Sequence, residues 1–67
     1  MVKFMDIVEL RTKTGLSQSQ FAKKFHLSLR TLQSWEQGIY KTPEKYLFLI
    51  GYIIDLENEI SNIRVNL

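Results

Sequence analysis

Two helix-start signals lie only eleven positions apart in this chain, and that spacing limits the fold more than any other feature. Ser17 and Gln20 match a capping box, in which the serine hydroxyl and the glutamine side chain satisfy backbone N–H groups at a helix start. Ser28 is a second N-cap residue. Two amphipathic helices joined by so short a connection have to cross at a large angle. The sequence therefore predicts a helix-turn-helix corner.

Apolar residues around both caps support this prediction. Leu16 and Phe21 flank the first cap at the spacing of a hydrophobic staple, and Leu27 and Leu32 repeat that spacing around the second. Leu32 and Trp35 then share one face of the second helix. We interpret Trp35 as a core residue. The alternative, a stacking platform for single-stranded nucleic acid, leaves its spacing from Leu32 without an explanation.

Hydrophobic periodicity and helix stops predict the remaining elements, and no segment has the pattern of a strand. The expected helices span residues 2–13, 17–25 and 28–37, followed by one that starts at Thr42-Pro43-Glu44. The tail either continues that last helix or forms a fifth helix capped by Asp55. The expected fold is all-α, a compact bundle of four to five short helices. It forms a single domain over residues 1–67, with its core at 4–54 and a helical extension at 55–67.

Composition argues against several functional classes. The chain has no cysteine and one histidine, His26, so it has no disulfide framework, no thiolate and no second imidazole for a metal site or a dyad. It also lacks a glycine-rich phosphate loop, and the three carboxylates between residues 55 and 59 do not converge on one helix face. We therefore expect no enzymatic activity, no metal and no cofactor.

Hydropathy gives no membrane signal. The N-terminus lacks a signal-peptide pattern, because a carboxylate interrupts its apolar run, and the most apolar window, residues 46–54, is too short to cross a bilayer. We expect a cytoplasmic protein with no membrane partner. At 67 residues the chain is near the size at which one core is self-sufficient, so a dimer partner would add needed stability.

Charge is distributed unevenly along the chain. Residues 1–41 carry seven Lys and Arg against three Asp and Glu, a net +4, whereas residues 42–67 carry two against four, a net −2. The basic part contains the predicted helix-turn-helix. This asymmetry favours a polyanionic partner, although a charge of this size is a weak signal alone.

The segment 7–43 resembles the DNA-binding domain of lambda-type phage repressors and Cro proteins, the XRE-like helix-turn-helix family. Residues 31–38, TLQSWEQG, look most like the version in HigA-type antitoxins. The resemblance covers more than half of the chain, and the C-terminal third matches only as generic helices. It rests on the following positions: Leu16-Ser17-Gln18, Phe21-Ala22, Leu27-Ser28, Leu32, Trp35-Glu36 and Gly38.

Two structural features are implied by this resemblance. Arg11 and Glu36 occupy the places of a family ion pair that joins the first helix to the third; the alternative is two independent surface charges. His26 stands at the corner, where the family usually has glycine. Histidine is among the residues that tolerate a positive φ, so we expect His26 to act as a turn residue.

The second helix of the corner is expected to enter the major groove of double-stranded DNA. With Leu32 and Trp35 inward, helical geometry turns a polar set outward, and the resemblance places base contacts in it. Arg30 suits guanine, Gln33 suits adenine, and Leu29 suits a thymine methyl group. The candidate base-contacting residues are Ser28, Leu29, Arg30, Gln33 and Ser34. Each of the polar residues could instead belong to an ordinary solvated helix face.

Contacts to the DNA backbone are also implied by the resemblance. Gln18, at the start of the first helix of the corner, would contact a phosphate with the helix dipole behind it. Gln37, Tyr40 and Lys41 lie where the family contacts phosphates after the recognition helix.

An apolar stripe in the C-terminal third is a candidate dimer surface. Its members recur at spacings of three and four, and they are Ile53, Leu56, Ile60, Ile63 and Leu67, with Ile54 as an alternative at the start. The competing interpretation is that the stripe packs inside one subunit. A dimer would bind two half-sites about 34 Å apart and so raise the weak affinity of a single subunit.

Two functions of different classes therefore compete. The first is a sequence-specific transcriptional regulator, most simply a repressor that binds a palindromic operator as a homodimer. The second is an antitoxin whose main role is to bind a partner toxin, with DNA binding secondary. An enzyme is the weakest hypothesis.

Overall fold

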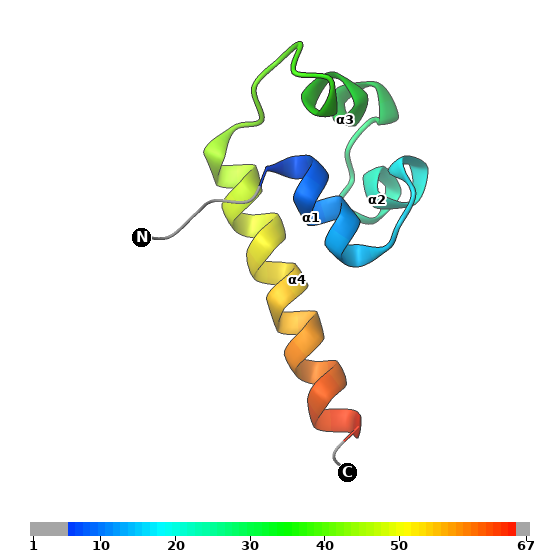
Figure 1. Cartoon of the computed structure of the whole chain (residues 1–67), viewed down its shortest axis with the longest axis vertical. Helices are drawn as coiled ribbons and strands as arrows, with labels where there is room; N and C mark the ends of the chain where they lie inside the picture. The colour runs from blue at the N-terminus through cyan, green and yellow to red at the C-terminus, as the bar shows by residue number, and fades with distance from the viewer. Residues whose placement is uncertain (1–5, 66–67) are drawn as a thin grey trace.

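A computed structural model describes the backbone of residues 6–65 and the side chains of residues 6–61. Over that range the chain forms four helices and no strand, which confirms the all-α prediction. Three short helices form a head beside the first half of a long fourth helix, whose C-terminal half extends past α1 (Figure 1). The elements are α1 (Ile7–Thr14), α2 (Gln18–Lys24), α3 (Leu29–Glu36) and α4 (Glu44–Val65).

The start of α1 differs from the prediction. The sequence pattern placed it near residue 2, but Asp6 has an extended backbone, with φ −80° and ψ 176°, and the helix begins at Ile7. The Asp6 carboxylate accepts a 2.8 Å hydrogen bond from the Glu9 N–H. This residue is therefore the N-cap and not part of a helix interior. The earlier part of the predicted helix, residues 2–5, lies outside the described residues.

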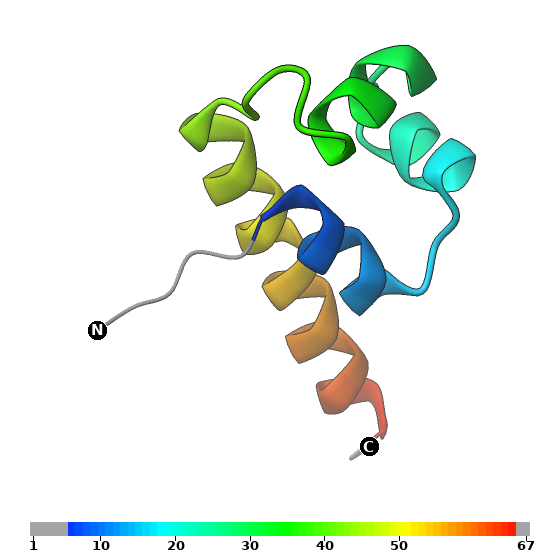
Figure 2. The same cartoon turned by 45° about the horizontal axis from the view of Figure 1, so that its top comes forward.

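Both predicted caps and the corner are present. Ser17 Oγ accepts from the Gln20 N–H at 3.1 Å, and Gln20 Oε1 accepts from the Ser17 N–H at 3.0 Å, which completes the capping box. Ser28 Oγ accepts from the Thr31 N–H at 3.0 Å. Between α2 and α3, His26 has a φ of 56°. His26 thus occupies a left-handed turn position. After this turn, α3 packs across α2 above α1 (Figure 2).

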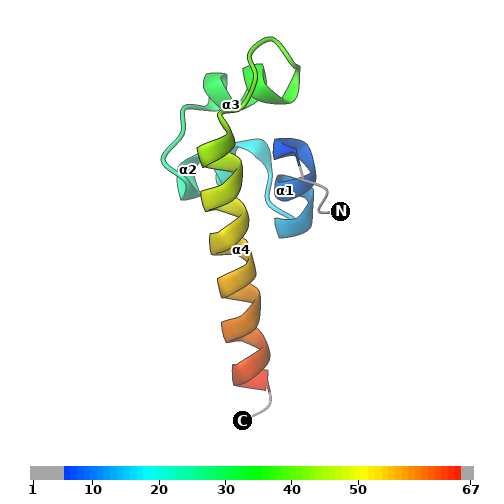
Figure 3. The ribbon, with the colours of Figure 1, turned by 90° about the vertical axis from the view of Figure 1, so that its left-hand side faces the viewer.

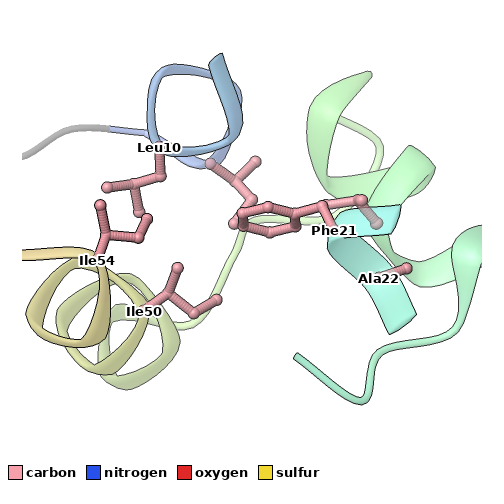
Figure 4. Packing of buried hydrophobic residues seen from close by; sticks show 7 residues of the cluster. Leu10, Phe21, Ala22, Ile50 and Ile54 are labelled. Atoms are coloured by element: carbon pink, nitrogen blue, oxygen red, sulfur yellow. The ribbon is translucent and has the colours of Figure 1, made fainter. Parts of the chain in front are cut away.

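All four helices contribute residues to the core. Phe21 of α2 and Leu32 of α3 are completely buried, and Figure 4 shows Phe21 facing Leu10 of α1 and the isoleucines of α4. The buried apolar residues are Ile7, Leu10, Phe21, Ala22, Leu32, Ile50 and Ile54. Trp35 is half-buried, packs against this cluster, and lies with its ring centroid 5.6 Å from that of Tyr46. These contacts fix α3 from behind.

The tail continues α4 without a break, so the alternative of a fifth helix capped by Asp55 is wrong. Asp55 lies inside α4, and its carboxylate accepts from Lys13 Nζ at 3.3 Å. Lys24 Nζ lies 2.8 Å from a Glu57 carboxylate oxygen in the same manner. Two lysines of the basic N-terminal part therefore pair with α4 of the same chain. This internal pairing accounts for part of the charge asymmetry.

Candidate nucleic-acid interface

The N-terminal turn of α3 is exposed on the side away from α4. Ser28, Leu29 and Arg30 are all exposed, and 40% of the Leu29 surface is accessible to solvent. Among the described residues, the Arg30 guanidinium makes no ion pair. An exposed leucine beside an unpaired arginine gives this helix end both an apolar group and a cationic hydrogen-bond donor. These are the two kinds of group that contact base edges in a major groove.

Gln33 and Ser34 are less open than the sequence suggested. Both are half-buried. The Ser34 backbone carbonyl accepts from the Ile39 N–H at 3.0 Å, just after the C-terminal end of α3. Gln33 Nε2 donates a long hydrogen bond of 3.5 Å to Gln18 Oε1. These two residues therefore form a recessed continuation of the exposed first turn.

A chain of hydrogen bonds connects this surface to α1. Arg11 and Glu36 form a two-pronged ion pair, with Nε to Oε2 at 2.7 Å and Nη2 to Oε1 at 3.0 Å. The Glu36 side chain is only 8% exposed, compared with 22% for Arg11. Gln18 Nε2 also donates to Glu36 Oε1 at 3.2 Å, and the chain continues from Gln18 to Gln33. Three helices are thereby joined around one carboxylate.

The ion pair perturbs both of its members. Hydrogen bonds from Arg11 hold the pKa of Glu36 below its ordinary value, and they outweigh burial, which acts in the opposite direction. The same hydrogen bond raises the pKa of Arg11 above its ordinary value. Both groups are therefore charged at neutral pH. Arg11 also donates to the Leu16 carbonyl at 3.1 Å, which ties the start of the α2 cap to α1.

The contact between Gln18 and Glu36 was not foreseen from the sequence, which suggested only a phosphate contact for Gln18. The two residues are 18 positions apart, and no local pattern relates them. The one available signal is chemical: a carboxylate accepts several hydrogen bonds, and a two-pronged arginine does not use all of its acceptor sites.

The remaining candidates for backbone contact lie beyond the C-terminal end of α3. Gln37, Tyr40 and Lys41 are exposed, and Tyr40 has 67% of its surface accessible. They surround Gly38, whose φ of 78° reverses the chain direction. Ile39, which the sequence did not select, is 62% exposed in the same loop. The structure thus has exposed candidates at both ends of α3. Among the described residues, Gln18 forms hydrogen bonds with Glu36 and Gln33 and not with residues of the loop that contains Lys41.

The described residues of the apolar stripe in the tail are exposed. Ile53, Leu56 and Ile60 are between 40% and 51% exposed, while Ile54 is 4% exposed and belongs to the core. The side chains of Ile63 and Leu67 lie outside the described residues. No helix in the described part of the chain is long and apolar enough to cross a membrane.

Comparison with known proteins agrees with this geometry. A family model described as Helix-turn-helix matches residues 7–50. A segment of 33 residues is 46% identical to Antitoxin HigA-2 of Vibrio cholerae serotype O1, covering 49% of this chain and 32% of that protein. The matched segment therefore spans only about a third of the relative's length. No solved structure matches the chain significantly.

Proposed function

Because this chain belongs to the helix-turn-helix family, we propose that it is a sequence-specific transcriptional regulator that binds double-stranded DNA through α3. The observation that carries the proposal is the exposed first turn of α3. There, Leu29 and Arg30 point away from a core that Leu32 and Trp35 hold in place. An apolar group and an unpaired guanidinium on the same exposed turn are the kinds of group that contact base edges in a major groove.

In this proposal the side chains have different roles. Arg30 donates two hydrogen bonds to guanine O6 and N7, and Leu29 contacts a thymine methyl group. Ser28, Gln33 and Ser34 contact neighbouring base edges. The residues that position the domain on phosphates are Gln18, Gln37, Tyr40 and Lys41.

We further propose that the protein is a repressor and acts as a homodimer on a palindromic operator. Support comes from the small number of cations near α3: in the described part of the interface only Arg30 and Lys41 carry a positive charge away from an ion pair. So few phosphate contacts give one subunit a weak affinity. Two subunits that bind half-sites about 34 Å apart overcome this weakness.

The experiment that tests the proposal uses a duplex selected by the purified protein from a randomised library. Affinity is measured by fluorescence anisotropy for that duplex and for an unselected one. Arg30→Ala is expected to weaken binding to the selected duplex by about 5- to 150-fold, the range for losing one two-pronged base contact, and to affect the unselected duplex much less.

Lys23→Ala is the matched control, because Lys23 is an exposed cation on α2 that lies outside the proposed interface. It should leave the preference for the selected duplex unchanged. Equal affinity of the wild type for both duplexes, or an equal effect of the two substitutions, would refute sequence-specific binding through α3.

The match to Antitoxin HigA-2 favours a second candidate function, that of an antitoxin that binds a partner toxin. Its test is co-expression with the product of the adjacent gene, followed by purification through a tag on this chain. A stoichiometric complex that survives Arg30→Ala supports the antitoxin function. A homodimer that binds the selected duplex and retains no second protein counts against it.

A further inference from the structure

One face of α4 carries apolar residues in an uninterrupted seven-residue pattern. Their spacings are three, four, three and four, and all of these residues are exposed, between 37% and 53%. We define them as the α4 seam: Tyr46, Leu49, Ile53, Leu56 and Ile60. In the sequence the pattern continues through Ile63 and Leu67, whose side chains lie outside the described residues. A sustained pattern of this period is the signature of a left-handed coiled coil.

The α4 seam is distinct from the face that builds the core. Leu47, Ile50 and Ile54 turn toward α1 and α2, whereas the seam residues lie on a neighbouring face of the same helix. Tyr46, at the N-terminal end of the seam, also lies against Trp35, with ring centroids 5.6 Å apart. The other four seam residues do not belong to the core cluster, so core packing does not explain the seam from Leu49 to Ile60. A contiguous exposed apolar row of this length on a small protein indicates an interaction surface.

Beyond Glu57, which pairs with Lys24, α4 extends past the head, and no other helix of the described chain lies beside this last segment in either view (Figure 1, Figure 3). A helix segment of two or three turns without tertiary contacts is marginal in water. Ile60 of the α4 seam lies in this segment and is 51% exposed. A partner along the seam would supply the packing that the segment lacks within one chain.

Charges that border the seam indicate what the partner is. Lys45 and Glu59 occupy the same position of the seven-residue pattern, at opposite ends of the seam, and neither forms an ion pair among the described residues. By contrast, Asp55 and Glu57 are already paired with lysines of the head. Two antiparallel copies would bring Lys45 of each to Glu59 of the other. The surface is thus self-complementary, as a two-fold interface requires.

We propose that the α4 seam pairs with the α4 seam of a second copy of this chain in an antiparallel coiled coil, with Lys45 of each copy facing Glu59 of the other. The inference rests on the proposed homodimer and names its interface. It extends the tail stripe expected from the sequence up to Tyr46, beside the head. Dimerisation through this face does not require DNA, so it is tested separately.

Sedimentation equilibrium of the full chain, without DNA, measures the dimer directly. The wild type is expected to be a dimer at about 100 μM. Leu56→Asp should weaken the dimer by at least about 100-fold, because it buries a carboxylate in the seam. Phe48→Asp is the matched control: Phe48 is more exposed, at 68%, and lies on α4 outside the seam. It should remain a dimer.

Circular dichroism checks that each variant retains its helices. If Leu56→Asp fails to fold, Ile60→Asp takes its place, since Ile60 is 51% exposed and does not belong to the core cluster. A monomeric wild type at this concentration overturns the proposal. Loss of the dimer in Phe48→Asp, with an intact dimer in the seam variants, overturns it as well.

Charge reversal tests the orientation. Lys45→Glu and Glu59→Lys should each weaken the dimer by about 3- to 30-fold, and the double variant should restore it, since rim ion pairs are individually small but occur twice. Failure of the double variant to restore the dimer overturns the antiparallel arrangement. Arg30→Ala should leave the dimer intact, so a failed DNA-binding proposal and a failed interface give different results.

Discussion

The Glu36 carboxylate joins α3 to α1 and α2, so its substitution tests how these three helices are held together. The substitution Glu36→Gln keeps the shape of the side chain and removes its charge. In the native protein this carboxylate accepts two hydrogen bonds from Arg11 and one from Gln18, and it is 8% exposed. After the change, the Arg11 guanidinium keeps its charge, but it faces a neutral amide oxygen in place of the carboxylate, besides the Leu16 carbonyl and solvent.

The expected loss of stability follows from these contacts. A hydrogen bond to a charged group contributes about 1.5–3 kcal/mol, against about 1 kcal/mol for a neutral one, so neutralising both Arg11 bonds removes about 1–4 kcal/mol. Because Arg11 is 22% exposed, solvent offsets part of this loss, and we expect about 2 kcal/mol. The domain as a whole should have about 3–10 kcal/mol of stability. The melting temperature should then fall by roughly 8–16 °C.

The assay is urea unfolding followed by circular dichroism at neutral pH. Asp55→Asn is the control, since it neutralises an ion pair with Lys13 in which both side chains are largely exposed, at 40% and 66%. That control should change the free energy of unfolding by less than about 0.5–1 kcal/mol. An effect of Glu36→Gln no larger than that of Asp55→Asn would refute the reasoning that the Glu36 pair is structurally important.

The pH dependence provides a second check on the same residue. The native pKa of Glu36 is lowered, so its contribution to stability is fully present above the unfolded pKa of about 4.3 and is lost as the pH falls through the native pKa. The difference in unfolding free energy between wild type and Glu36→Gln should therefore be constant from about pH 5 upward and should narrow below about pH 4. A difference that does not narrow in acid would show that the charge is not responsible.

Three further substitutions are expected to change the free energy of unfolding, measured in each case by urea titration. Gly51→Ala should stabilise the protein by about 0.5–1 kcal/mol, because alanine favours the helix more than glycine does and the added Cβ lies at an ordinary 3.7 Å from Leu10 Cδ2. A loss of stability would show that α1 and α4 pack too closely for this methyl group. His26→Gly should stabilise the protein by a few tenths to about 1 kcal/mol, because glycine adopts the positive φ of 56° without strain. A loss of stability would mean that the imidazole has a role besides the turn. Ser17→Ala should destabilise by about 1 kcal/mol, and a neutral effect would show that the capping box adds nothing here.

The sequence predicted the features that depend on nearby residues. Ser17 and Ser28 start their helices because a hydroxyl bonds to an N–H three positions away. Each of these preferences acts within a single turn of chain. The family resemblance also indicated the Arg11–Glu36 pair, which spacing alone does not show.

Features that depend on distant residues were not predictable in this way. Asp6 is an N-cap residue, but the sequence pattern predicts a helix that begins near residue 2 and therefore places Asp6 inside it. Asp55 is a good cap residue, yet it lies within α4 and pairs with Lys13, 42 positions away. Lys24 pairs with Glu57, 33 positions away. In each case the deciding partner is on another helix.

The charge of Glu36 has a consequence for the proposed DNA-contacting surface. A carboxylate only accepts hydrogen bonds, so the Gln18 atom that faces it has to be the amide nitrogen. The Gln18 oxygen then faces Gln33, which has to present its own nitrogen. The Gln33 oxygen and its second N–H remain available, and these are the acceptor and donor that an adenine edge requires. The ion pair with Arg11 therefore orients an amide two residues further along the hydrogen-bond chain, and disruption of the pair would alter base preference as well as stability.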